Sequence, residues 1–427
     1  MNEQGIPGLV PAYEDYTRCV HCGLCLNHCP TYRLWQLEAD SPRGRIRQMI
    51  LVNEGQLPMS SVFVGHIDKC LDCRACETAC PSGVEYGKLV EYARARIERD
   101  YRRPWSSRVL RSLALTRILP SPARIATTAK AIRFYQRSGL QKLARGSGIL
   151  RLLRLAKSEG LLPRIDDEFF YDQLGKSFPA MGERRARVAL FAGCVANVAF
   201  SRLHEATIRV LTANGCEVVV PDQQFCCGAL AAHAGVRETA RELARRNLAA
   251  FAGGGFDAIV TNAAGCGSTM KEYERLFSAN EPEREKAVAF QSQVRDVTEF
   301  LAHLGLTARL RQMAVRVTYQ DSCHLLHGQK VREAPRRLLR AIPGLDFVEL
   351  PYGDLCCGSA GIYNLTETET SLELLEEKMK NAKSTGARVI VTANPGCSLQ
   401  MRAGVQLHKT GQEVLHVVEI LDRALSS

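Results

Sequence analysis

The stretch FCCGAL, from Phe225 to Leu230, recurs 130 residues later as LCCGSA, from Leu355 to Ala360. A glycine follows the adjacent cysteines in both copies. Two further cysteines recur with nearly the same offset, 129 residues in one case and 131 in the other: Cys194 with Cys323, and Cys266 with Cys397. Three landmarks at an almost constant offset indicate an internal duplication in this half of the chain.

The single cysteines of each copy follow short β-branched runs that are typical of buried strands: RVALFAGC, DAIVTNAAGC, VRVTYQDSC and ARVIVTANPGC. Helical stretches such as HEATIRVLTANG separate these runs, and the alternation predicts a parallel α/β unit in each half. Sites in open α/β sheets form where the strands end, so we expect the cysteines to converge in two quartets. They are Cys194, Cys226, Cys227 and Cys266, and Cys323, Cys356, Cys357 and Cys397.

Four other residues of this half could belong to a site or to the core. Cys216 lies outside the repeat, and we expect a buried core thiol there. His233, His324 and His327 follow the candidate cysteines closely in the sequence. Each is either a ligand or a structural histidine, and the sequence leaves both readings open.

Two cysteine runs near the N-terminus have the spacing C-x2-C-x2-C-x3-C-P: CVHCGLCLNHCP and CLDCRACETACP. This is the spacing of bacterial ferredoxins, in which three cysteines of one run and the last cysteine of the other bind one [4Fe–4S] cluster. We therefore predict one cluster on Cys19, Cys22, Cys25 and Cys80, and a second on Cys70, Cys73, Cys76 and Cys29. The alternative is a pair of zinc sites, but zinc gives no reason for two four-cysteine runs that end in Cys-Pro.

The segment between the two runs predicts helices instead of ferredoxin hairpins. Ser41 is a candidate N-cap, Pro42 suits the first helical position, and Gly55 is a stop signal. Residues 89–101 predict a second helix. Three arginines of the first helix either offset the negative charge of a thiolate-bound cluster or form a solvated basic face: Arg43, Arg45 and Arg47.

A basic segment from Arg102 to Lys157 contains 14 lysines and arginines and neither aspartate nor glutamate. Leucine, isoleucine and aromatic residues alternate there with arginine at helical intervals, as in helices that lie on anionic membranes, and Trp105 could anchor such a helix. The segment could equally bind a partner, or pack on the protein's own core and leave a basic rim. Nucleic-acid binding is disfavoured because aromatic residues are sparse and no nucleic-acid module is visible.

Length and composition limit the class of protein. A chain of 427 residues with 46% hydrophobic residues favours several globular domains. No apolar run is long enough to span a bilayer, and the first residues show no secretory signal, so we expect a cytoplasmic protein. In that reducing compartment, 17 cysteines are metal ligands or redox groups rather than disulfides.

The spacing of the repeated cysteines resembles that of the CCG domains of the heterodisulfide reductase B-subunit family. The full order of two ferredoxin runs, SPRGRI, a basic linker, CCGA, LCCGSAG and VTANPGC is similar to the iron–sulfur subunits of bacterial glycolate oxidases (glycolate dehydrogenases). The sequence departs from the heterodisulfide reductase pattern at Ala263 and Asn394, where that family has one more cysteine. A conventional cluster, a mixed-ligand site and cysteines kept for packing are therefore all open for the two quartets.

The resemblance implies a multidomain α+β protein in which an N-terminal α-helical ferredoxin domain precedes a duplicated α/β CCG domain with pseudo-twofold symmetry. We expect the ferredoxin domain at residues 1–100, the basic and mostly helical linker at 101–184, and the two repeats at 185–310 and 311–427.

The resemblance also implies an electron-transfer subunit, without a catalytic residue of its own, in an oxidoreductase that acts on a CH–OH donor. Flavin subunits would oxidise glycolate, and two [4Fe–4S] clusters would pass the electrons to a quinone-type acceptor on the cytoplasmic face of the inner membrane. The sequence has no recognisable flavin or NAD motif, which agrees with that division of labour. The alternatives are a subunit of a related lactate or glycerol-3-phosphate dehydrogenase, and a thiol–disulfide oxidoreductase.

Overall fold

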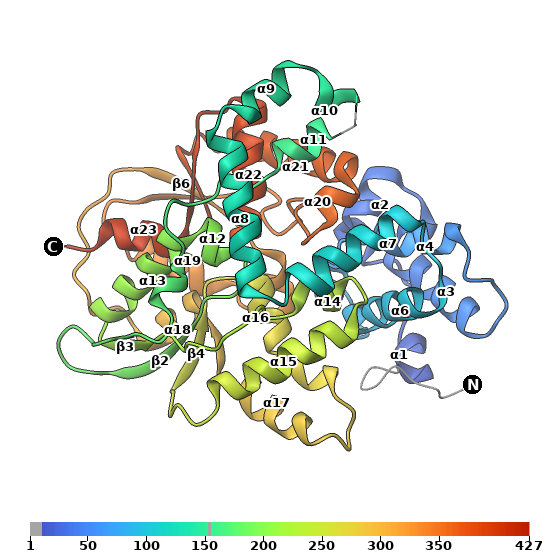
Figure 1. Cartoon of the computed structure of the whole chain (residues 1–427), viewed down its shortest axis with the longest axis horizontal. Coiled ribbons are helices and arrows are strands. Elements are labelled where there is room, and N and C mark those ends of the chain that lie inside the picture. Colours follow the sequence, from blue (N-terminus) through green and yellow to red (C-terminus); the bar gives the residue numbers. More distant parts are fainter. Residues whose placement is uncertain (1–10, 153–154, 427) are drawn as a thin grey trace.

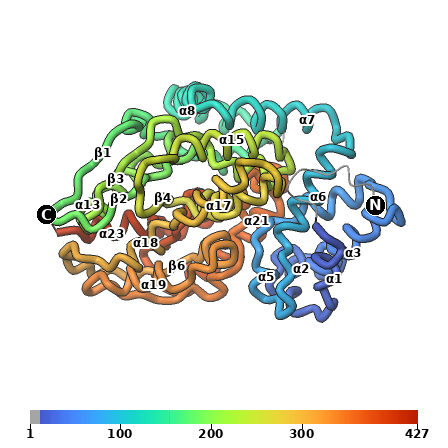
Figure 2. Tube along the Cα trace, turned by 90° about the horizontal axis from the view of Figure 1, so that it is seen from below, coloured from blue at the N-terminus to red at the C-terminus, as the bar shows by residue number. Residues whose placement is uncertain are grey.

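The computed structural model describes residues 11–152 and 155–426 (Figure 1). The N-terminal helices lie at one end of the molecule and the C-terminus lies at the other, in both views (Figure 2). The described residues before Tyr101 form only helices and loops. These helices are α1 (Tyr13–Thr17), η1 (Leu26–His28), α2 (Pro30–Trp35), η2 (Glu38–Asp40), α3 (Pro42–Asn53), α4 (Ser61–Asp68), α5 (Ala75–Thr78) and α6 (Tyr86–Asp100).

Helix α3 begins and ends as its sequence predicts. The side chain of Ser41 accepts a hydrogen bond from the backbone N–H of Gly44 at 2.9 Å, and Pro42 takes the first helical position. The helix ends at Asn53, and Gly55 follows with a φ of 72°. The second predicted helix is confirmed as α6.

The basic segment is helical, as predicted, and extends along one face of the molecule from the ferredoxin end toward the two sheets (Figures 1 and 2). Its elements, together with the 3₁₀ turn that follows, are α7 (Trp105–Ser112), η3 (Leu113–Ile118), α8 (Pro122–Arg137), α9 (Leu140–Gly146), α10 (Ile149–Leu152), α11 (Ala156–Gly160) and η4 (Phe170–Gln173).

The first repeat is built on a sheet with the strand order β1-β3-β2-β4-β5, in which only β1 is antiparallel. Its strands are β1 (Ser177–Phe178), β2 (Ala186–Phe191), β3 (Cys216–Val219), β4 (Ala258–Thr261) and β5 (Val294–Asp296). Its helices are α12 (Ala196–Ala199), α13 (Ser201–Ala213), α14 (Ala229–His233), α15 (Arg237–Phe251), α16 (Ala264–Met270), η5 (Tyr273–Leu276), α17 (Pro282–Gln293) and α18 (Val297–Leu304).

The second repeat has a fully parallel sheet with the order β7-β6-β8-β9, which matches the order β3-β2-β4-β5 of the first. Its strands are β6 (Arg316–Gln320), β7 (Asp346–Glu349), β8 (Val389–Thr392) and β9 (Glu413–His416). Its helices are η6 (His324–Gly328), α19 (Glu333–Arg340), α20 (Tyr363–Thr366), α21 (Thr368–Ser384), α22 (Pro395–His408) and α23 (Val417–Ala424). The predicted duplication of an α/β unit is therefore confirmed.

One hydrophobic core extends through both sheets. Val188 and Val260 of the first sheet and Val317 and Val391 of the second are fully buried in the same cluster. Cys216 is also fully buried in this cluster, as predicted. Because the two repeats share this core, the loops at the carboxyl ends of their strands are held in fixed positions relative to each other.

The glycine after each cysteine pair is required by the backbone. Gly228 has a φ of 82° and Gly358 a φ of 88°, a region that residues with a Cβ atom rarely adopt. A Cβ atom on Gly358 would lie 2.5 Å from the carbonyl oxygen of Ser371 on α21, and one on Gly228 would lie 3.2 Å from the Cα atom of Ala240 on α15. The turn after each pair therefore packs directly against a helix.

Candidate iron–sulfur centres and the cavity between the repeats

The four cysteines predicted to hold the first ferredoxin cluster lie near the protein surface. Cys22 is exposed, and Cys19, Cys25 and Cys80 are partly exposed. Burial raises the pKa of the Cys19 thiol, and the neighbouring thiols of Cys80 and Cys22 raise it further. The last cysteine of the second run thus lies beside the first run, as the ferredoxin spacing predicts.

The four cysteines predicted to hold the second cluster are all buried: Cys29, Cys70, Cys73 and Cys76. Burial raises the pKa values of Cys73 and Cys76 well above the usual value, and the neighbouring thiols of Cys29 and Cys70 contribute to both shifts. Cys29, from the first run, therefore lies among the thiols of the second run.

The loops of the two runs have the same bend. His21 and Gly23 in the first run have positive φ angles of 55° and 84°, and the matching Asp72 and Arg74 in the second run have angles of 51° and 60°. Left-handed residues between the cysteines turn successive side chains toward one centre. This repeated geometry explains how three thiols of each run can face one cluster.

Several groups donate to, or lie beside, the sulfur atoms of the buried set. The backbone N–H of Asp72 donates to the Sγ atom of Cys70 at 3.3 Å, and the hydroxyl of Tyr86 approaches the same Sγ atom at 3.7 Å. Arg45 is 1% exposed, and Cys70 and Cys29 contribute to the increase in its pKa. Donors and a buried cation are what a negatively charged thiolate-bound cluster requires, so these residues fit an iron–sulfur cluster.

The cysteines of the repeats meet in two quartets, as predicted. In the first repeat, hydrogen bonds to Cys194 and Cys227 raise the pKa of Cys226, and Cys266 bonds to Cys227. In the second repeat, Cys356 interacts with Cys323, which raises its pKa, and with Cys357, which lowers it, and Cys397 interacts with Cys357. Four convergent thiols in each quartet are a donor set that suits iron–sulfur chemistry.

The two quartets differ in their electrostatics. Hydrogen bonds from Cys226 and Cys266 lower the pKa of Cys227 well below the usual value. The matching Cys357 has its pKa raised to about 12, because Cys356 acts on it in the opposite direction. In the second quartet, the side-chain amide of Asn394 also lies 3.4 Å from the Sγ atom of Cys397, whereas the side chain of Ala263 at the equivalent position has no polar atom.

A cavity of about 730 Å³ lies between the quartets, and all eight of their cysteines line it. The ferredoxin domain contributes Cys70 and Asp72 to the lining, and helix α7 contributes Ser107 and Leu110. Three parts of the chain that are far apart in sequence therefore build one cavity. Apolar residues such as Phe191, Leu230 and Ile362 line much of the rest.

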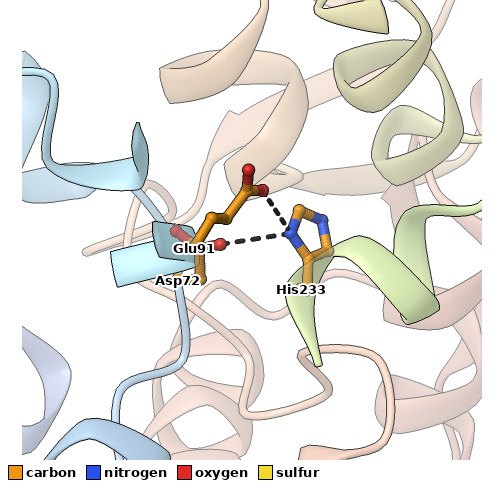
Figure 3. Close-up of side chains that lie close together, drawn as sticks. All are labelled: Asp72, Glu91 and His233. Carbon is orange, nitrogen blue, oxygen red and sulfur yellow. Dashed lines mark hydrogen bonds and ion pairs between the residues drawn. The ribbon is translucent and has the colours of Figure 1, made fainter. Parts of the chain in front are cut away.

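A charged cluster joins the ferredoxin domain to the first repeat beside this cavity. The Nδ1 atom of His233 lies 2.9 Å from a carboxylate oxygen of Glu91 and 3.2 Å from one of Asp72 (Figure 3). Burial alone would lower the pKa of His233, but the two carboxylates raise it to about 9. The imidazole is therefore held as an imidazolium, and the junction is an ion pair.

These three side chains also lie close enough together to hold a metal ion. The guanidinium of Arg74 opposes that role, because it lies 3.6 Å from Glu91 and 3.9 Å from Asp72 and is itself only 3% exposed. Cations already surround both carboxylates, so the cluster is better explained as a contact between domains than as a metal site.

The other two histidines bond to the ferredoxin domain. The Nε2 atom of His324 lies 2.9 Å from the backbone carbonyl oxygen of Asp72. Both nitrogen atoms of His327 are engaged, Nδ1 with the Thr78 hydroxyl at 2.9 Å and Nε2 with the carbonyl oxygen of Asp354 at 3.0 Å. His233 and His324 line the cavity, and His327 is outside its lining.

Sequence reasoning did not single out Asp72, Glu91, Arg74 or Tyr86. Asp72 and Arg74 lie between the cysteines of the second run, where the spacing motif specifies no residue type, and Glu91 and Tyr86 lie on an ordinary amphipathic helix. The sequence held one indication of their role: Asp72 and Arg74 lie between cysteines that are predicted to bind a cluster, and a residue in such a position must lie close to that cluster.

The basic linker exposes large apolar side chains. Trp105 is 72% exposed and Leu110 is 68% exposed on α7, and Phe134, Leu143 and Leu152 are exposed on the helices that follow. None of the helices in the described ranges is long and apolar enough to cross a membrane.

Four segments of the chain match the models of three known protein families. Residues 15–84 match the "4Fe-4S dicluster domain", and residues 188–271 and 317–402 each match the "Cysteine-rich domain" called CCG. Residues 106–162 match the "Glycolate oxidase iron-sulfur subunit, linker region". The chain is also 40% identical to the probable glycolate oxidase iron-sulfur subunit of Bacillus subtilis (strain 168), and the match covers 95% of this chain and 93% of the relative.

The chain belongs to the glycolate oxidase iron-sulfur subunit family. The glycolate oxidase iron-sulfur subunit of Escherichia coli (strain K12) is 33% identical over 95% of this chain and 93% of its own length. Lactate utilization protein A of Oceanobacillus iheyensis is 32% identical over 55% of this chain and 96% of its own length. These findings confirm the resemblance, the fold class and the presence of iron–sulfur domains.

Proposed function

We propose that this chain is the electron-transfer subunit of a flavin-dependent glycolate (2-hydroxy acid) dehydrogenase. Flavin subunits in the same hetero-oligomer oxidise the CH–OH group of the substrate, and this chain conducts the electrons to a quinone-type acceptor. The names of the full-length relatives support glycolate as the substrate. The lactate utilization relative makes a lactate dehydrogenase the second candidate.

The observation that carries this proposal is the order in which the sulfur sets are buried. The set that contains Cys22 reaches the surface, and the set that contains Cys73 is enclosed. Cys73 in turn lies beside Cys356 at the wall of the cavity. This order supports a route from an exposed docking point for a flavin partner to a protected site for an acceptor.

The eight ferredoxin cysteines are the proposed ligands of two [4Fe–4S] clusters, which supply one-electron steps when bound. The fold provides for such steps by burying Cys29, Cys70, Cys73 and Cys76 and by donating two hydrogen bonds to the sulfur atom of Cys70. The CCG quartets are proposed sites for further iron. We assign neither flavin nor NAD to this chain, and we place the domain boundaries after residues 100, 184 and 310.

The basic linker supports a peripheral position on the cytoplasmic face of the inner membrane, where a quinone is dissolved. Sedimentation with vesicles that contain anionic lipid tests this point. We expect the complex to sediment with such vesicles at low salt and much less at high salt, because screening weakens the attraction of basic residues to anionic lipid. Trp105→Glu should reduce binding, and Leu407→Glu, at another exposed apolar position, is the matched control.

The test of the electron-transfer proposal is Cys22→Ser in the complex with its flavin partner. The wild-type chain should contain ~8 iron atoms in its ferredoxin domain. The variant should lose iron and reduce a quinone at least tenfold more slowly, while glycolate still reduces the partner's flavin. Cys216→Ser is the control, because Cys216 lies in the core away from both runs. Quinone reduction at the wild-type rate in Cys22→Ser, or zinc in place of iron, would contradict the proposal.

A further inference from the structure

His324 belongs to the second repeat by sequence but faces the first repeat in space. It begins η6 directly after Cys323, and η6 packs against α16, where the Nε2 atom of Gln329 donates to the carbonyl oxygen of Ala264 at 2.9 Å. The Nδ1 atom of His324 lies 3.6 Å from the position that a Cβ atom on Gly265 would occupy. Gly265 immediately precedes Cys266 of the first quartet.

The hydrogen bond of His324 to the ferredoxin domain fixes its tautomer. A carbonyl oxygen only accepts, so the Nε2 atom, 2.9 Å from the carbonyl oxygen of Asp72, must carry the proton. In a neutral imidazole the Nδ1 atom then presents a lone pair. Across residues 11–152 and 155–426, no hydrogen bond engages that atom, and the side chain lines the cavity between the quartets.

This arrangement is the one that metal-ligating histidines adopt. Such a histidine donates the N–H of one ring nitrogen to a backbone carbonyl or a carboxylate, which orients the ring and directs the other nitrogen at the metal. His327, three residues later in the same turn, lacks this arrangement because both of its nitrogens are already bonded to protein atoms.

The first quartet lacks one cysteine of the related motif and has no polar side chain in its place. Ala263 stands where the related motif has a further cysteine, and its methyl group cannot bind iron. The second quartet differs, because the amide of Asn394 occupies the equivalent place beside Cys397. The residue of the first repeat that matches His324, at the same offset of 129, is the apolar Val195, so the second quartet receives no histidine in exchange.

We propose that the Nδ1 atom of His324 is a ligand of an iron–sulfur cluster held by Cys194, Cys226, Cys227 and Cys266, in place of the missing cysteine at position 263. This inference deepens the proposed function and rests on its assignment of iron to the repeats. It makes the two quartets unequal, because only the first has mixed cysteine and histidine ligands.

The assignment has two consequences for electron transfer. A neutral imidazole adds no negative charge, so this cluster has a higher reduction potential than one with a fifth thiolate. Asp72 lies two residues after Cys70. The hydrogen bond that its carbonyl oxygen accepts from His324 therefore connects the loop that carries Cys70 to the proposed histidine ligand by a short path. The first quartet is then the electron-accepting side of the cavity.

Pulsed electron paramagnetic resonance on the purified, iron-loaded complex tests the ligand directly. The protein is prepared with ordinary histidine and with ¹⁵N-histidine, and spectra are recorded at a series of applied potentials. We expect a cluster signal with coupling to one histidine nitrogen, which changes with the isotope. His324→Gln, which keeps a donor for the Asp72 carbonyl, should abolish that coupling, and the control His327→Gln should retain it.

Three results would overturn the proposal. One is a wild-type protein without coupling to a histidine nitrogen, which decides the matter even where His324→Gln fails to accumulate. A second is coupling that persists in His324→Gln. The third is an iron content that stays the same in the double variant Cys226→Ser, Cys227→Ser, because the first quartet would then hold no iron for His324 to bind. The ferredoxin route of the proposed function, which Cys22→Ser tests separately, would still stand.

Discussion

Cys73 of the second ferredoxin run and Cys356 of the second repeat lie in one buried cluster. Leu71, Ala75, Tyr363 and Leu374 complete this cluster, and Cys323 packs against it. The hydroxyl of Tyr363 also donates to the carbonyl oxygen of Lys69 at 3.0 Å, which ties the repeat to the ferredoxin loop. The two sulfur sets therefore meet among buried apolar side chains.

Cys356→Ser should interrupt electron transfer beyond the ferredoxin domain. The hydroxyl group of serine is a poor ligand for iron, but serine is close to cysteine in size and leaves the surrounding side chains in place. We expect at least tenfold slower quinone reduction by the complex, while the ferredoxin iron remains and substrate still reduces it. Iron analysis and stopped-flow spectroscopy measure the two effects. Unchanged quinone reduction would exclude the second quartet from the route.

Tyr86→Phe should lower the reduction potential of the buried ferredoxin cluster. The variant loses the hydroxyl group that lies 3.7 Å from the Sγ atom of Cys70. Hydrogen bonds to cluster sulfur stabilise the more negative, reduced state, so their removal disfavours reduction. A potentiometric titration followed by electron paramagnetic resonance measures the shift, with Tyr92→Phe on the same helix as control. A potential that is equal or higher in Tyr86→Phe would contradict this prediction.

The junction between the domains should weaken at alkaline pH. The pKa of His233 is raised from 6.5 to about 9, so its contribution is complete below pH 6.5 and is lost as the pH rises through about 9. The shift in the pKa of His233 corresponds to a contribution of at most about 3 kcal/mol to the free energy of unfolding. The difference in thermal denaturation midpoint between wild type and His233→Gln should therefore be large at pH 6 and small at pH 10. The exposed His303→Gln is the control, and a difference that is independent of pH would refute the ion pair.

Gly358→Ala should destabilise the second repeat more than Gly228→Ala destabilises the first. Both variants place alanine at a positive φ, which costs about 1–2 kcal/mol. At Gly358 the added Cβ atom also lies 2.5 Å from a backbone oxygen of α21, which cannot move without shifting the helix. Thermal denaturation and the yield of folded protein rank the two variants. Equal effects would show that α21 accommodates the methyl group.

Local patterns in the sequence were enough to predict helix α3 and the duplicated α/β unit, and they also yield the proposed ferredoxin ligand sets. The cysteine spacing restricts which thiols can surround one cluster, and Ser41 and Pro42 define where α3 begins. The offsets of 129 to 131 residues predict that both repeats fold alike, and the matching strand orders confirm it. Each of these signals depends on residues close together in the chain or on a repeat.

Only the tertiary structure decided how the parts meet. The sequence predicts two cysteine quartets but not that they face each other across one cavity, with Asp72 and α7 in its lining. It singles out His233 and His324 but gives no indication that the first pairs with Glu91 and the second bonds to Asp72. The first contact joins residues 142 positions apart in the sequence and the second joins residues 252 positions apart. Both contacts depend on the packing of whole domains. No local spacing encodes such a contact, because its geometry arises only when the shared core fixes both repeats against the ferredoxin helices.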